Sequence, residues 1–202
     1  MDLFEAIKGR RSIRNYEDKP VEDEKIGIIL EACRWSPSAG NRQPWEIIIV
    51  DDPDLIEKLS KAAFEQLWIA TAPIVLVVCI NEKIATANYG KRGEMYALET
   101  MGCAVQNMML TAYSLGLGSC LVSAFDEDEV KEITGCLEFI RPVALLPIGY
   151  PAERPETPYR DEIPQFTYLN KFGEKKYEPS WKGLSDYKNR MKKKIMRTLE
   201  KI

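Results

Sequence analysis

The 202-residue sequence contains no histidine. This absence excludes catalytic triads and dyads that use a histidine base, metal sites with imidazole ligands, and haem held by a proximal histidine. An enzyme of this composition takes its chemistry from a bound cofactor, or from carboxylates, lysine, tyrosine and cysteine. The sequence therefore favours a protein whose reactive group is supplied by a cofactor.

Cysteine is also scarce, and its spacing does not suit a metal site. The five cysteines are odd in number, and no two of them form a CxxC pair, so zinc and iron–sulfur sites are disfavoured. Most lie in apolar runs, where a buried and reduced thiol is the ordinary role. This usage favours a reducing compartment, and we expect a cytoplasmic protein.

Long apolar runs and a strong net charge are missing as well. The longest apolar run, residues 74–80, is far too short to span a bilayer, and the first residues lack the features of a signal peptide. A formal net charge of −3 does not favour coating of nucleic acid or of an anionic membrane. With 45% hydrophobic residues, the chain can bury a sizeable core. We expect no membrane and no nucleic-acid partner.

Helical and strand patterns follow one another irregularly along the chain. Because they do not alternate strictly as βαβ units, an α+β fold is favoured over a doubly wound sheet. Capping residues and apolar spacing predict helices over residues 2–9, 21–35, 52–64, 90–115 and 126–135, and strands over residues 45–50, 74–80, 119–122 and 143–148.

The amino-acid composition changes toward the end of the chain. Four prolines make residues 150–166 an extended arm, of the kind that commonly wraps around a partner subunit. The basic residues of 184–202 predict a helix with a solvated charged face, with nucleic-acid binding as the alternative. Residues 1–170 are expected to form the ligand-binding domain, and residues 171–202 a helical extension of it.

A cluster of cations follows the first predicted helix, at Arg10, Arg11 and Arg14, with Ser12 between them. Guanidinium groups provide forked donors that match phosphate geometry, and the serine hydroxyl adds another donor. The alternative is a solvated basic turn. Guanidinium groups this close repel one another unless an anion or carboxylates lie between them, so the segment is a candidate phosphate site.

A second candidate segment covers residues 37–45, with the sequence PSAGNRQPW. Its small residues let a flat ligand approach the backbone closely, and Asn41 and Gln43 offer the paired donors and acceptors that suit a heterocycle edge. The alternative is an ordinary connection between a helix and a strand that starts at Trp45.

Four segments together resemble the nitroreductase family: RRSxR at 10–14, PSAGNxQPW at 37–45, LGLGSC at 115–120 and LPIGYP at 146–151, in the family's order. The resemblance covers about residues 1–170. It implies a three-layer α+β fold, in which helices flank a central, mostly antiparallel sheet and an extended C-terminal arm follows. It also implies a homodimer with FMN bound at the subunit interface.

The resemblance assigns roles at the phosphate end of FMN. Arg10, Arg11 and Ser12 would hold the phosphate and ribityl groups, and Arg14 would approach the N1/O2 side of the ring. Arg160 would return to the phosphate from the arm, although the Asp161 that follows it departs from the family pattern.

The resemblance also assigns the residues around the isoalloxazine ring. The partner subunit would line the ring with Pro37, Ser38, Ala39 and Asn41. Gln43 belongs to the same loop, where it contacts the flavin or, with Trp45, supports the loop. A backbone N–H near N5 and O4 would come from Val122, Ser123, Ala124 or Phe125.

The resemblance implies that the flavin carries the chemistry, with no catalytic side chain. NADH or NADPH would reduce it, and a nitroaromatic, a quinone or another electron-poor small molecule would reoxidise it. Two alternatives stay open on the same fold: a relative that performs reductive dehalogenation or flavin breakdown, and a non-enzymatic flavin-binding or regulatory protein.

Overall fold

The computed structural model describes residues 1–174, 176–178 and 183. The chain divides into two compact units, Met1–Pro155 and Glu156–Ile202, so each is considered by itself. The division falls earlier than the boundary at residue 170 that the sequence suggested. Every segment of the candidate site except Arg160 belongs to the first unit.

The first unit is built on a four-stranded antiparallel sheet in the order β1-β2-β4-β3. In the centre of the sheet, Val77 lies opposite Ile48 on one side and Leu145 on the other. The strands are β1 (Trp45–Val50), β2 (Ile74–Asn81), β3 (Gly118–Ser119) and β4 (Ile140–Gly149).

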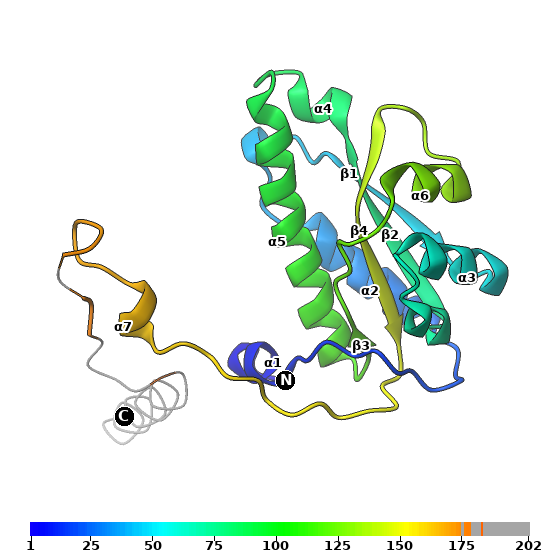
Figure 1. The fold of residues 1–202 in the computed structure, drawn as a ribbon, viewed down its shortest axis with the longest axis horizontal. Helices are drawn as coiled ribbons and strands as arrows, with labels where there is room; N and C mark the ends of the chain where they lie inside the picture. The colour runs from blue at the N-terminus through cyan, green and yellow to red at the C-terminus, as the bar shows by residue number, and fades with distance from the viewer. Residues whose placement is uncertain (175, 179–182, 184–202) are drawn as a thin grey trace, which may run out of the picture. The chain divides into compact units, whose positions relative to one another are not determined.

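Helices cover both faces of this sheet (Figure 1). Successive side chains of a strand point to opposite faces, so the continuous apolar run of β2 is buried on both sides. Leu76 joins the core formed with α2 and α5, whereas Val77 joins the core formed with α3, η2 and α6. The three-layer α+β fold is confirmed. The helices are α1 (Leu3–Gly9), α2 (Asp23–Arg34), η1 (Ala39–Asn41), α3 (Pro53–Ala62), η2 (Leu67–Thr71), α4 (Glu82–Thr86), α5 (Arg92–Ser114) and α6 (Glu127–Thr134).

Several element boundaries differ from the sequence-based expectation. The short helices η2 and α4 were not expected, and β4 begins at Ile140 instead of residue 143. The predicted strand over 119–122 is split, because β3 ends at Ser119 and Val122 then pairs separately with Leu145. Both differences depend on long-range pairing with the neighbouring strand, which local sequence does not reveal.

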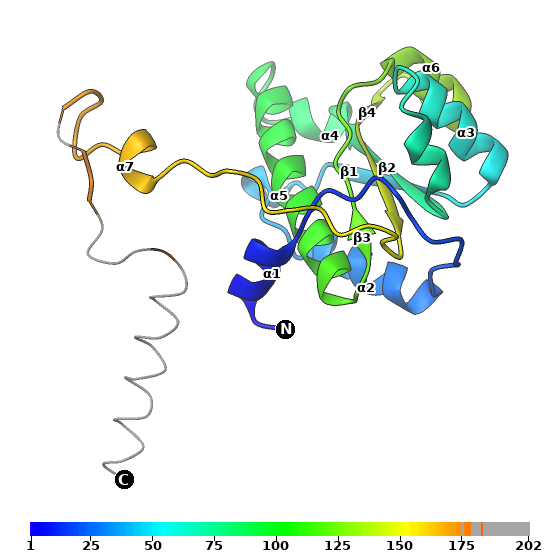
Figure 2. The ribbon, with the colours of Figure 1, turned by 60° about the horizontal axis from the view of Figure 1, so that its bottom comes forward.

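The segment after α1 lies between two parts of the chain that are distant in sequence (Figure 2). Ser12 forms a parallel bridge with Ser119, and the Ile13 N–H donates to the Ser119 carbonyl at 3.1 Å. On the other side, Tyr16 pairs with Pro151, and the Ala152 N–H donates to the carbonyl of the residue before Tyr16. The basic segment is therefore held between β3 and the start of the arm.

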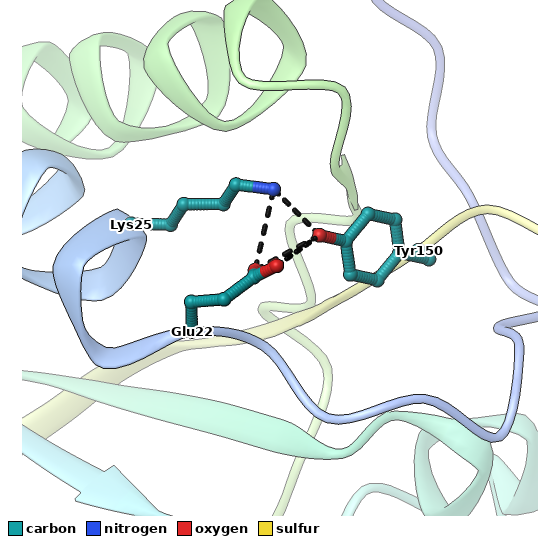
Figure 3. Close-up of polar contacts among 3 residues, drawn as sticks. All are labelled: Glu22, Lys25 and Tyr150. Carbon is teal, nitrogen blue, oxygen red and sulfur yellow. Dashed lines mark hydrogen bonds and ion pairs between the residues drawn. The ribbon is translucent and has the colours of Figure 1, made fainter.

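The start of the arm is anchored by the contacts drawn in Figure 3. The Tyr150 hydroxyl lies 2.9 and 2.8 Å from the two carboxylate oxygens of Glu22, and it accepts a hydrogen bond from the Lys25 ammonium. A backbone N–H and this hydroxyl donate to Glu22 and lower its pKa to about 2. These contacts join α2 to the end of β4, where the arm leaves the sheet.

The described part of the second unit contains one helix, α7 (Ile163–Phe166). Glu162 and Gln165 form a capping box around it, so the arm is not extended throughout residues 150–166 as predicted. The basic segment 184–202 lies outside the described residues. None of the helices in the described ranges combines the length and apolar character needed to cross a membrane.

Candidate functional site

The basic segment borders a cavity of about 390 Å³, a size typical of sites for small molecules. The helix α1 ends at Gly9, which lies so close to α5 that an added Cβ would sit 2.1 Å from the Tyr113 hydroxyl oxygen. This contact places the following arginines at the cavity. The lining comprises Gly9, Arg10, Arg11, Ile13, Tyr113, Leu117, Gly118, Ser119, Pro151, Glu153, Arg154 and Pro155.

Three guanidinium groups gather at this cavity, from Arg10, Arg11 and Arg154. The Nη1 group of Arg11 donates to the carbonyls of Lys8 at 2.7 Å and of Arg10 at 2.8 Å, so it also satisfies carbonyls at the end of α1. The forked donors of the Arg10 and Arg154 guanidinium groups match the geometry of an anion such as phosphate. The cavity lining thus offers cationic hydrogen-bond donors to an anion.

The LGLGSC segment forms the wall behind the arginines. A Cβ on Gly118 would lie 2.7 Å from the Ile13 side chain, so only glycine permits this close packing of the two backbones. Ser12 is directed toward Cys120. Burial raises the pKa of the Cys120 thiol, and Arg14 and a hydrogen bond with Ser12 partly offset this increase.

Arg14 lies on another side of the basic segment and contacts a different element. Its guanidinium carbon is 5.8 Å from the centre of the Trp68 ring, in η2, and its backbone N–H donates to the Glu153 carboxylate. The Gln66 amide, just before η2, donates to the Ala124 carbonyl at 3.1 Å. The unexpected turn η2 therefore connects Arg14 with the 122–125 segment.

The residues of the 122–125 segment are not equivalent. The Val122 N–H donates to the Leu145 carbonyl at 2.9 Å and its side chain is buried in the core, as is that of Phe125. Ser123 and Ala124 are exposed. These two residues are therefore open to solvent, while the Val122 donor is already paired.

The loop over residues 37–43 has an unusual backbone. Gly40, Asn41 and Gln43 all have positive φ values, of 56°, 54° and 51°. Asparagine and glycine accept this conformation readily, but it is strained for glutamine and is typical of functional loops. The Gln43 N–H donates to Ser38 Oγ at 3.2 Å and its side chain to Asn41 Oδ1 at 3.2 Å, so Gln43 stabilises the loop from within.

This loop and the arginine cavity meet α5 at different places. The Ala39 N–H donates to Thr100 Oγ1, whereas Gly9 packs on Tyr113, thirteen positions further along the helix. At 1.5 Å per residue, the two contacts are roughly 20 Å apart along the helix axis. The loop lines a different hollow, with Arg42 and Tyr89 among its walls. One chain therefore does not bring the two predicted segments together.

Arg160 belongs to the second unit, where its Nη1 group donates to the Tyr159 carbonyl at 2.9 Å.

Four residues of the site region were not among the sequence-based candidates. Arg154 and Glu153 follow the LPIGYP segment, and their charge next to that motif was an available signal. Gln66 and Trp68 gave no comparable signal, because tertiary packing of η2 brings them to the basic segment.

Comparison with known proteins decides the family. The model of the nitroreductase family matches residues 7–77 and 66–150, and so covers the predicted segments up to Tyr150, without Pro151 and Arg160. The chain belongs to the nitroreductase family. It is therefore an oxidoreductase, as the four segments implied.

Relatives of this nitroreductase-family chain carry related names. The NADH dehydrogenase of Thermus thermophilus is 35% identical over 181 residues, covering 76% of this chain and 88% of the relative. The FMN reductase [NAD(P)H] of Bacillus subtilis is 31% identical over 187 residues, covering 84% and 75%. A crystal structure of a nitroreductase family protein from Clostridium difficile superposes with a TM-score of 0.76 at 31% identity, covering 85% of this chain and all of that one.

Proposed function

We propose that this chain is an FMN-dependent NAD(P)H oxidoreductase, which works as a homodimer and reduces nitroaromatics, quinones or similar electron-poor small molecules in the cytoplasm. The observation that carries the proposal is the cavity that Arg10, Arg11 and Arg154 all line. Its donors suit the phosphate of a mononucleotide, and relatives of this chain include an FMN reductase.

The residues at this cavity fit the phosphate end of FMN. Arg10, Arg11 and Arg154 would bind the phosphate oxygens, and Ser12 would bind there or at the ribityl chain after its hydroxyl turns away from Cys120. Each charge-assisted contact of this type contributes about 1.5–3 kcal/mol. Arg160 stays a proposed additional phosphate ligand from the second unit.

The residues around η2 fit the ring end. FMN supplies the hydride acceptor and donor when it is bound. Arg14 would place its positive charge at the N1/O2 side, where it favours uptake of electrons. The backbone N–H of Ser123 or Ala124 would donate near N5 and O4, because the Val122 N–H is already paired with Leu145.

The other wall of the site would come from a second copy of the chain. The partner would present Pro37, Ser38, Ala39, Asn41 and Gln43, since these residues cannot reach the arginine cavity of their own chain along α5. The outer face of α5 supports this arrangement, because Met95 and Leu98 are 45% and 47% exposed and Gly102 is open. Such an apolar stripe is typical of a helix that packs against another subunit.

Turnover of the purified protein tests this function. With FMN bound, the protein should oxidise NADH or NADPH only when a quinone or a nitroaromatic compound is present to accept the electrons under anaerobic conditions. A variant with Arg10→Gln and Arg11→Gln serves as the control, and added FMN at high concentration should partly restore it. Tight flavin binding without oxidation of either nicotinamide would contradict the proposed reaction.

A further inference from the structure

One acidic side chain lies at the arginine cavity and needs a physical explanation. Among the described residues that line this cavity, Glu153 alone is acidic, and it shares the lining with Arg10, Arg11 and Arg154. A site that only had to bind a phosphate would exclude a carboxylate, because two anions repel each other. We propose that Glu153 acts as an internal counter-anion, which competes with the FMN phosphate and keeps the flavin exchangeable.

The backbone holds Glu153 in this position. Its carboxylate accepts the backbone N–H of Arg14. The preceding residues, Pro151 and Ala152, pair with the segment at Tyr16 and Asn15. Glu153 is also half-buried. The negative charge is thus a fixed part of the cavity.

This charge has opposite effects with and without a phosphate. Without a ligand, the carboxylate offsets the repulsion among the three guanidinium groups and stabilises the empty site. A bound phosphate monoester brings between −1.5 and −2 charges at neutral pH, and the carboxylate then repels it. Both effects reduce the part of the FMN affinity that the phosphate group contributes. Salt screens interactions between charges over a length of about 8 Å at physiological ionic strength, so both effects should weaken as salt is added.

The inference rests on the proposed function and names a property of the same site. An enzyme with a carboxylate at its phosphate site exchanges FMN with the solution instead of retaining it permanently. Riboflavin has the same ring and ribityl chain but no phosphate, so Glu153 should not affect its affinity. The ratio of the two affinities therefore isolates the effect of the carboxylate on the phosphate.

The test is a fluorescence titration of the full-length protein with FMN and with riboflavin. Glu153→Gln removes the charge but keeps an oxygen that can accept the Arg14 N–H. It should lower the Kd for FMN about tenfold, mainly through slower dissociation, and leave the Kd for riboflavin within about twofold. The gain in FMN affinity caused by Glu153→Gln should be smaller in 1 M salt. Glu138→Gln, an exposed position on the turn before β4, removes the same charge away from the cavity and should change neither Kd.

The possible outcomes separate the inference from the proposed function. Weaker or unchanged FMN binding by Glu153→Gln, in a protein with normal thermal unfolding, would show that the residue only organises the site and would overturn the inference. Equal tightening of FMN and riboflavin would overturn it as well. Glu153→Ala, which also removes the hydrogen bond to Arg14, should tighten FMN less than Glu153→Gln does. A wild-type protein that binds neither flavin would contradict the proposed function itself.

Discussion

A site shared between subunits predicts that two inactive variants restore each other. One variant carries Arg10→Gln and Arg11→Gln, which removes two guanidinium groups from the cavity. The other carries Gly40→Val in the loop that the partner is proposed to supply. Gly40 has a φ of 56°, and a Cβ there would lie 2.5 Å from the Tyr89 hydroxyl oxygen, so valine displaces the loop.

The expected loss of FMN affinity and the expected fraction of restored sites can both be estimated. Loss of two charge-assisted contacts costs about 3–6 kcal/mol, or roughly 10²–10⁴ in FMN affinity. Because the contacts at Thr100 and Tyr113 are roughly 20 Å apart, each site takes its arginines from one chain and its loop from the other. A mixed dimer then has one site with both changes and one intact site. Random mixing gives about half mixed dimers, so about a quarter of the wild-type sites are restored.

The assay is co-expression of the two variants with different tags, followed by purification through both tags. The isolated mixed dimers should bind about half of the wild-type FMN content and show about half of its turnover, while each variant alone shows almost none. Mixed dimers without flavin and without turnover would refute the shared site, because they would show that both segments serve the same chain's site.

Three further predictions concern single positions. Arg154→Gln should weaken FMN binding about 10-fold or more while riboflavin affinity stays unchanged in the same titration, and equal losses for both would contradict a phosphate contact. Cys103 is exposed within the single chain, so a dimer that packs along α5 should cover it. Mass spectrometry should then show slow alkylation of Cys103 in dimers and fast alkylation after dilution to monomers. Burial raises the pKa of Cys33 to about 11, so Cys33 should react slowly in both states. The Arg141 guanidinium lowers the pKa of Glu127, so Glu127→Gln should destabilise the fold by roughly 0.5–1 kcal/mol at pH 7 in urea titrations. This difference should decrease as the pH falls through the folded-state pKa of Glu127, and a difference that does not depend on pH would contradict the ion pair.

Local sequence signals predicted much of the fold. Asp126 caps α6 by accepting the N–H groups of Asp128 and Glu129, as the acidic run indicated. The apolar run of β2 is buried on both faces, and Met101 and Met108 on α5 belong to the core. These features depend on capping and on hydrophobic periodicity, which a single sequence displays directly.

Features that depend on contacts between distant segments were harder to predict. The turn η2 has no strong local signal, and its role follows from packing of Trp68 near Arg14. Arg154 reaches the cavity because the chain after β4 pairs with the basic segment, and this pairing is invisible in either segment alone. The Val122 N–H was a candidate donor until its pairing with Leu145 was seen. The family motifs located the site, but the fold decides which atoms are available.

The visible absorption spectrum of the purified protein, followed by denaturation and identification of the released cofactor, tests the central claim most directly. We expect a flavin spectrum and about one FMN per subunit after incubation with excess FMN, since Glu153 allows some loss during purification. A colourless protein that also fails to take up added FMN would contradict FMN binding, because Arg10, Arg11 and Arg154 would then not form a flavin phosphate site.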